Sequence, residues 1–281
     1  MHPFTLSRRQ LLAATSMVPL QAAGGVKVID AHAHLFHHSR PSWREDERKL
    51  IHAADKLKID VLCCSVLPPD RPMTLEGCIE SNRMAWEGAK RFARRILPYC
   101  TINPGYGKAA LDEVRRCIHD RGFIGIKLYN DYRTDEPVYW PLTELAIELR
   151  VPMLQHSGHT TWLPAPQPRI SDAAHIAALA ARYPEAMIIC AHIAGGGDWE
   201  WTAKALRHAK SVYLDLSGSN IDEGTVELAH RILGPERLLF ACDMSMTASV
   251  GRIRGAAIPE DARRKILGAN MQHILDRRSK A

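Results

Sequence analysis

Short apolar runs alternate with longer amphipathic stretches along most of this chain. Several of the runs are apolar on both faces, which is typical of parallel strands covered by helices. We predict strands at 26–34, 60–67, 96–102, 123–128, 151–155, 187–191, 212–216 and 238–242. Apolar residues recur at helical spacing between these strands and after the last one. This spacing predicts helices at 43–58, 75–95, 108–120, 137–149, 172–183, 199–209, 222–233 and 259–275.

Strict alternation of strand and helix over this length leaves two architectures, a doubly wound sheet or a closed (β/α)₈ barrel. No G-x-G-x-x-G sequence follows the first strand, and the count of eight strands favours the barrel. We find no linker or internal repeat that divides the chain. The sequence therefore predicts a single-domain α/β protein with a TIM-barrel fold over residues 24–281.

The first 23 residues differ from the rest. Residues 7–12, S-R-R-Q-L-L, resemble a twin-arginine export signal, and a modestly apolar segment with small residues follows them. Cleavage after Ala22 or Ala23 would leave a mature chain that begins almost at the first strand. We therefore expect a signal peptide at 1–23 and a periplasmic or secreted protein. The alternative is an N-terminal helix that contains an arginine pair.

The net charge of +6 does not indicate a nucleic-acid partner. The arginine pairs are dispersed over predicted helices, and no nucleic-acid-binding motif accompanies them. Apart from the N-terminal segment, no stretch is long and apolar enough to cross a bilayer. We therefore expect a small-molecule substrate and no stable membrane association after cleavage. The sequence leaves a homo-oligomer open.

Residues of metal-ligand type stand where several predicted strands end. His32 and His34 end the first strand, and His156, His192 and Asp243 end the fifth, sixth and eighth. Residues i and i+2 of a strand face the same side, and barrels carry their chemistry at this end of the strands. Imidazoles that converge on one point suit a borderline-soft divalent cation such as zinc. The alternative is histidines that bond to water or backbone.

The chain from residue 26 onward resembles the amidohydrolase superfamily, in the amidohydrolase-2 branch that also contains nonoxidative decarboxylases. The resemblance rests on D-A-H-A-H at 30–34, G-I-K-L-Y at 125–129, L-Q-H-S-G at 154–158, A-H-I-A-G-G-G at 191–197, Asp243 and G-A-N ending at Asn270. It implies a catalytic divalent metal, zinc first and manganese second, bound by His32, His34, His156 and Asp243. It also implies that His192 either transfers protons and polarises the substrate or binds a second metal.

Two positions need separate treatment: the end of the eighth strand departs from the pattern of the branch, and the role of Lys127 is not fixed by that pattern. The eighth strand ends in A-C-D-M-S, whereas the branch often has G-T-D-x-P, so the loop after Asp243 can differ. Lys127 occupies the position where binuclear members of the superfamily carry a carboxylated lysine. We favour a structural or substrate-contacting lysine, and a second metal site at Lys127 and His192 is the alternative.

The resemblance predicts a metal-dependent hydrolase that uses a metal-bound water to cleave an ester, lactone or amide bond of a small carboxylated molecule. Asp243 would take the proton of that water, and His192 would steady the oxyanion or protonate the leaving group. The alternative is a metal-dependent decarboxylase for an aromatic or unsaturated acid, in which Asp243 protonates carbon. A non-enzymatic metal-binding role is a third hypothesis. Four loop residues are candidates for substrate binding: Tyr129, Arg133, His159 and Trp162.

Overall fold

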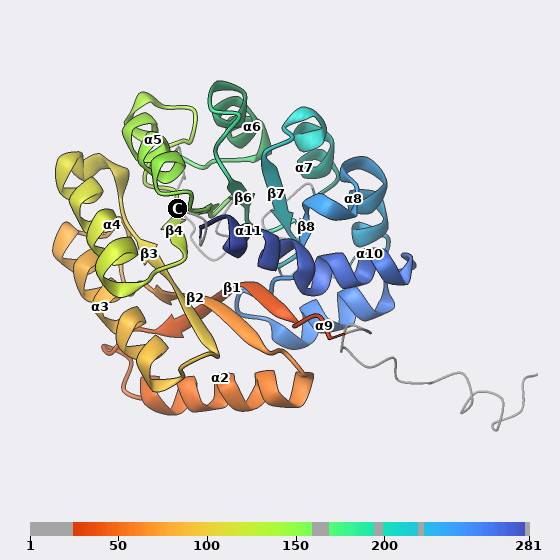
Figure 1. Cartoon of the computed structure of the whole chain (residues 1–281), viewed down its shortest axis with the longest axis horizontal. Coiled ribbons are helices and arrows are strands. Elements are labelled where there is room, and N and C mark those ends of the chain that lie inside the picture. Colours follow the sequence, from red (N-terminus) through yellow and green to blue (C-terminus); the bar gives the residue numbers. More distant parts are fainter. Residues whose placement is uncertain (1–24, 159–168, 194–198, 219–221, 279–281) are drawn as a thin grey trace, which may run out of the picture.

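The computed structural model describes residues 25–158, 169–193, 199–218 and 222–278. Its centre is one sheet of eight parallel strands, in which each strand pairs with the next along the chain (Figure 1). The strands are β1 (Ile29–Phe36), β2 (Val61–Leu67), β3 (Ile96–Thr101), β4 (Gly125–Leu128), β5 (Met153–Gln155), β6 (Ile188–Cys190), β7 (Val212–Asp215) and β8 (Leu238–Leu239).

The last strand returns to the first. The N–H of Ala31 donates to the carbonyl of Phe240 over 2.9 Å, and the N–H of Asp243 donates to the carbonyl of His32 over 2.6 Å. Ala33 and Asp243 also form a parallel bridge. These contacts bring the two edges of the sheet together, which confirms the predicted (β/α)₈ TIM barrel.

Helices surround the strands as predicted, with two corrections. The expected single helix 259–275 is divided by a π-helical turn at Lys265–Ala269, and an additional helix, α9, follows β8. Glycines and short polar residues in α9 weaken its helical pattern in the sequence. No helix in the described ranges is long and apolar enough to span a membrane. The α-helices are α2 (Trp43–Leu57), α3 (Leu75–Arg91), α4 (Lys108–Arg121), α5 (Trp140–Glu148), α6 (Ala173–Arg182), α7 (Trp199–Ala205), α8 (Thr225–Leu233), α9 (Met246–Gly255), α10 (Glu260–Arg264) and α11 (Asn270–Arg278).

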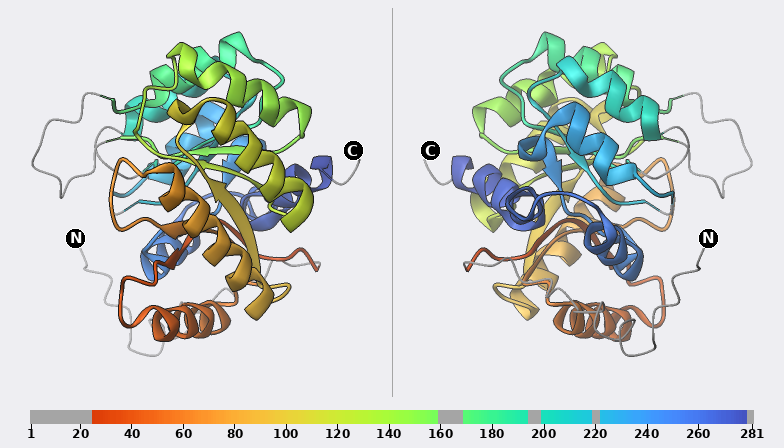
Figure 2. Two further views of the ribbon diagram at one scale, coloured as in Figure 1. Left: turned by 90° about the vertical axis from the view of Figure 1, so that its left-hand side faces the viewer. Right: turned by 90° about the vertical axis from the view of Figure 1, so that its right-hand side faces the viewer.

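Two hydrophobic clusters hold the barrel together. The larger one lies between the strands and the surrounding helices. The smaller one fills the barrel interior with residues such as Ile29, Tyr99 and Ile189, and it includes Met271 and Ile274 of α11. The side views show α11 at one end of the barrel (Figure 2). This helix therefore seals the end of the interior at which the strands begin, and the opposite end is left for polar side chains.

A β-bulge in β1 decides where its histidines point. Asp30 pairs with Leu62 and Ala33 with Cys64, so three steps along β1 oppose two along β2. Before the bulge, Ala31 belongs to the interior cluster, whereas after it Ala33 and Leu35 belong to the outer cluster. Strand side chains alternate between faces, and an extra residue reverses that alternation. His32 and His34 therefore both face the interior, inside the strand and not at its end as the sequence predicted.

Candidate metal centre

The two histidines of β1 meet Asp243 at the open end of the barrel. The Nε2 atoms of His32 and His34 lie 3.2 Å apart. Oδ1 of Asp243 lies 3.0 Å from Nε2 of His34 and 3.9 Å from Nε2 of His32. Both imidazoles are buried, whereas the Asp243 side chain is 27% exposed. Three donor atoms thus face a common point that opens to solvent through the carboxylate.

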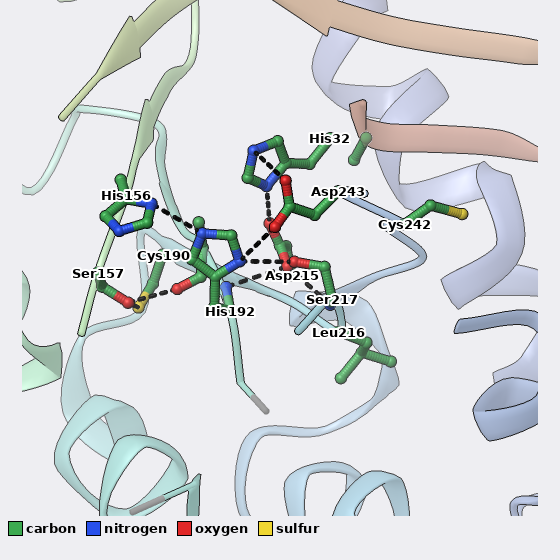
Figure 3. Close-up of polar contacts among 12 residues, drawn as sticks. His32, His156, Ser157, Cys190, His192, Asp215, Leu216, Ser217, Cys242 and Asp243 are labelled. Atoms are coloured by element: carbon green, nitrogen blue, oxygen red, sulfur yellow. Dashed lines mark hydrogen bonds and ion pairs between the residues drawn. The ribbon is translucent and has the colours of Figure 1, made fainter. Parts of the chain in front are cut away.

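His192 and His156 lie beside this group. Nε2 of His192 is 2.9 Å from Nδ1 of His156, and Nδ1 of His192 is 3.7 Å from Oδ2 of Asp243 (Figure 3). Nε2 of His156 is buried and has no hydrogen-bond partner among the described residues. A buried polar atom without a partner is costly unless something binds it. His156 therefore offers an unused nitrogen next to the cluster.

Lys127 of β4 reaches the same place from across the barrel. Its side chain is fully buried, and its Nζ lies 2.9 Å from Nε2 of His32. Burial lowers the pKa of the lysine to about 7, against the opposing effect of Asp243 and Asp215. The structure thus brings Lys127 into contact with the cluster. A structural or substrate-contacting role for Lys127 stays the prediction, with carboxylation as the alternative.

The histidines of the cluster are held in their neutral form. Burial lowers the pKa of His32 to about 3, with a further contribution from Lys127, and burial also lowers the pKa of His34, His156 and His192. Burial acts in the opposite direction on Asp243, but the hydrogen bond from His34 and the nearby imidazoles outweigh it, and its pKa lies well below the usual range. The cluster therefore presents neutral nitrogens and an ionised carboxylate.

Two buried carboxylates that the sequence reasoning missed support the cluster. Oδ2 of Asp215, at the end of β7, lies 2.8 Å from Nδ1 of His32. Oδ1 of Asp30 accepts the backbone N–H groups of His32 and Cys242, each over 3.0 Å. A signal for Asp215 was present, because V-Y-L-D-L at 212–216 is another apolar strand that ends in a metal-ligand residue type.

The predicted substrate-binding residues have different surroundings. Tyr129 is buried, with its ring 5.9 Å from that of His156. Arg133 is exposed, and its Nε lies 3.1 Å from Oδ1 of Asp135, so its role stays a prediction. His159 and Trp162 lie outside the described residues. Arg71, in the loop after β2, was missed, although its guanidinium stacks 3.9 Å from the centre of the Tyr129 ring.

His192 and Asp243 share an unusual backbone conformation. Their φ angles are 70° and 51°, in the left-handed region that non-glycine residues seldom adopt. Such conformations persist where the surrounding structure enforces them, and they are frequent at functional sites. The backbone contacts of Asp243 to β1, and of the His192 N–H to Oδ1 of Asp215 over 3.1 Å, provide that enforcement.

The donor set fits a divalent ion. His32, His34 and Asp243 form one group in which all ligand atoms lie within 4.8 Å of one another, and His32, His192 and Asp215 form a second. Neutral imidazoles and ionised carboxylates are the protonation states that coordination requires. His156 joins neither group, but its partnerless Nε2 is a further donor in the immediate surroundings. The second group shares His32 with the first.

Several solved structures share the fold of about nine tenths of this chain. The 2,6-dihydroxybenzoate decarboxylase from Rhizobium has a TM-score of 0.72 at 18% identity, with 89% of this chain and 99% of that chain covered. A dihydroxybenzoic acid decarboxylase from Polaromonas, solved with manganese and 2-nitroresorcinol, has a TM-score of 0.69 at 18% identity, and the match covers 89% of this chain and 97% of that chain. The 4-oxalomesaconate hydratase from Rhodopseudomonas palustris has a TM-score of 0.66 at 15% identity, and the match covers 90% of this chain and 97% of that chain.

Identities this low establish the shared barrel and no more. No curated protein matches the chain. The family model described as Amidohydrolase, however, matches residues 29–276, which include every strand of the barrel and the whole cluster of histidines and aspartates. That match confirms the amidohydrolase-2 resemblance found in the sequence motifs. The chain belongs to the amidohydrolase family.

Proposed function

We propose that this protein is a metal-dependent nonoxidative decarboxylase for a small hydroxylated aromatic or unsaturated carboxylic acid. The observation that carries the proposal is Arg71. Its guanidinium stacks on Tyr129. Its charge also contributes to lowering the pKa of His34, Lys127 and His156. Arg71 forms no ion pair with a described residue, although its charge also acts on the buried carboxyl group of Asp131. A guanidinium this close to the metal-ligand cluster suits a substrate carboxylate.

The comparisons support the same reaction class. Two of the similar structures described above are decarboxylases of dihydroxylated benzoic acids, and one of them contains manganese. A hydratase has the same fold, so the fold alone does not select the reaction. The arginine adds the chemical argument, because a decarboxylase must bind and orient a carboxylate.

The residues of the site divide the work as follows. A divalent ion held by His32, His34 and Asp243, with His156 as a further donor, would polarise a substrate oxygen. Arg71 binds the substrate carboxylate. Asp243 would take up the proton of the substrate hydroxyl group at Oδ2, the oxygen that faces Nδ1 of His192, and pass it to the carbon that loses carbon dioxide. The product would recover its hydroxyl proton from solvent. The carboxylate is ionised in the free site, so it can accept that proton before it protonates carbon.

Carbon dioxide release tests the proposal. The metal-loaded protein is incubated with hydroxybenzoates and unsaturated acids, and we expect release from at least one of them. Arg71→Ala should lower kcat/KM by about 10–100-fold, because a charged hydrogen bond is worth about 1.5–3 kcal/mol. Arg48→Ala, at an exposed arginine of α2 that pairs with Glu45, is the matched control and should leave the rate unchanged. No release from any acid, or equal losses in both variants, would contradict the proposal.

Hydrolysis of an ester, lactone or amide is the second candidate. The observation that favours it is the partly exposed, ionised carboxylate of Asp243, which can accept a proton from a water at the open end of the barrel. In that reaction His192 would protonate the leaving group. Turnover of lactones or activated esters without carbon dioxide release from any acid would establish this reading over the first.

We also propose one tightly bound metal per chain, zinc or manganese. The first donor group is complete without Lys127, and both oxygens of Asp215 in the second group already accept hydrogen bonds. Metal analysis of the purified protein should give a stoichiometry near one. A stoichiometry near two that falls in Lys127→Ala would instead indicate a carboxylated lysine that bridges two ions.

Export by the twin-arginine route is a further proposal, which rests on the sequence of residues 7–23. Replacement of Arg8 and Arg9 by lysine should leave the protein in the cytoplasm of an expressing cell. Fractionation and mass determination of the N-terminus measure this. Unchanged export of the double variant would contradict the proposal.

A further inference from the structure

Asp215 makes three contacts that involve the two sides of the metal centre. Its Oδ2 lies 2.8 Å from Nδ1 of His32, which comes from β1. Its Oδ1 accepts the backbone N–H of His192 over 3.1 Å and that of Ser217 over 2.8 Å. The side chain is completely buried. One carboxylate therefore contacts a metal-ligand candidate on the first strand and the backbone that carries the proton-transfer candidate after the sixth.

The contact with His32 fixes which nitrogen carries hydrogen. An ionised carboxylate can only accept hydrogen bonds, so Nδ1 of His32 must be the donor. A neutral imidazole then has its lone pair on Nε2, the atom that lies 3.2 Å from Nε2 of His34. A carboxylate behind a ligating histidine orients the ring and raises its basicity. Asp215 thus sets the tautomer in which His32 can bind a cation.

The contacts with the opposite side orient His192. The left-handed backbone of His192 is anchored by its N–H on Asp215. The same oxygen anchors Ser217, whose Oγ lies 2.9 Å from Nδ1 of His192. Asp215 therefore holds the backbone of His192 directly and its ring through Ser217 (Figure 3).

We infer that Asp215 is the positioning residue of this site: through its two oxygens it fixes the tautomer of His32 and the orientation of His192, so that metal binding and proton transfer depend on one carboxylate. The inference rests on the metal-dependent function proposed above. The rival is that Asp215 is itself a ligand in a second metal group with His32 and His192. Against this, both of its oxygens already accept hydrogen bonds from the protein.

Asp215→Asn separates these readings. If the amide oxygen keeps the two backbone N–H groups, the amide nitrogen faces His32 and donates to Nδ1, which moves the ring hydrogen to Nε2. We expect the His32 signal in a ¹⁵N–¹H spectrum of histidine-labelled, metal-free protein to change from the Nδ1–H to the Nε2–H tautomer. His32→Gln identifies that signal among those of the 14 histidines. Metal affinity, measured by chelator competition, should fall about 10–100-fold.

Asp30→Asn is the matched control. Asp30 is equally buried and accepts the backbone N–H of His32, but its side chain contacts no imidazole. The Asp30→Asn variant should therefore leave the His32 tautomer unchanged. Ser217→Ala tests the opposite contact and does not alter the Asp215 carboxylate: it should keep metal affinity and the His32 tautomer while lowering kcat more than it changes KM.

Neither the tautomer nor the affinity requires a substrate, so these readouts stand even if the proposed reaction is wrong. An Nε2–H tautomer of His32 in the metal-free wild-type protein would overturn the inference without any variant. So would Asp215→Asn with an unchanged tautomer and unchanged affinity. Loss of one of two bound ions in Asp215→Asn, with the tautomer retained, would assign Asp215 as a ligand instead.

Discussion

The two ends of the barrel interior differ in kind. Where the strands begin, the interior is apolar and α11 closes it with Met271 and Ile274. Where the strands end, the interior holds ionisable side chains such as His32, Lys127 and Asp215, all completely buried. Within β1 the change takes place at a single peptide bond, between Ala31 and His32.

Stability and chemistry therefore come from opposite ends of the same strands. Burial of apolar side chains at the sealed end stabilises the fold. Burial of ionisable groups at the open end opposes folding unless each group is paired. A barrel can hold so many buried histidines and carboxylates because its other end is closed by hydrophobic packing. Substitutions at the two ends should therefore change different measurable properties.

The largest effect is expected for His32→Ala at the open end. The substitution removes a donor of both metal groups, so metal affinity should collapse by more than the about 10–100-fold that loss of a supporting residue costs. The unfolding free energy of the metal-free protein should also fall, because the substitution leaves Oδ2 of the buried Asp215 without its imidazole partner. Chelator competition and urea unfolding measure the two quantities. Near-normal metal affinity would remove His32 from the ligand set.

Asp243→Asn should separate binding from chemistry at the same end. The amide oxygen can still coordinate weakly, so much of the metal should stay bound. Turnover should fall by about 10²–10⁴, because an amide cannot exchange a proton at neutral pH. Metal content and kcat are measured on the same preparation. A variant with full metal and a near-normal rate would leave His192 as the better candidate for proton transfer.

At the sealed end, Ile274→Ala should act on stability alone. Ile274 lies on the side of α11 that packs against the strands and is completely buried. Its truncation should cost about 2–5 kcal/mol of unfolding free energy. Metal affinity should not change, and Ile274→Val should recover most of the loss. If the alanine variant loses metal affinity in proportion to stability, the two ends are not independent.

The smallest effect concerns Asp131, a buried group in the loop after β4. Burial raises its pKa to about 6, although Arg71 and Arg169 oppose this. Because the folded pKa exceeds the unfolded value, ionisation of Asp131 destabilises the fold above about pH 6, and this cost disappears as the pH falls towards about 4. Asp131→Asn should therefore gain about 1–3 kcal/mol near pH 7.5 and nothing near pH 4. Urea unfolding at both pH values measures this, and equal differences would contradict it.

The sequence predicted the barrel because the eight apolar runs and their alternation with helices can be recognised without any knowledge of tertiary contacts. It also predicted that five side chains would converge at the open end of the barrel: His32, His34, His156, His192 and Asp243. It did not predict the bulge in β1, because the bulge depends on the register between β1 and β2. Arg71 was missed for a related reason: only the folded loop after β2 brings it to Tyr129. Helix α9 was missed because its pattern is weak.

The left-handed backbone at Asp243 affects how this sequence can change over time. Aspartate, asparagine and histidine tolerate that conformation better than other side chains, and glycine adopts it freely. Asp243→Gly would therefore relax the local backbone while it removes the carboxylate. A single codon change could in this way produce an inactive relative that folds as well as its parent. We therefore expect that natural homologues with an intact barrel but no aspartate at this position bind ligands and do not catalyse a reaction.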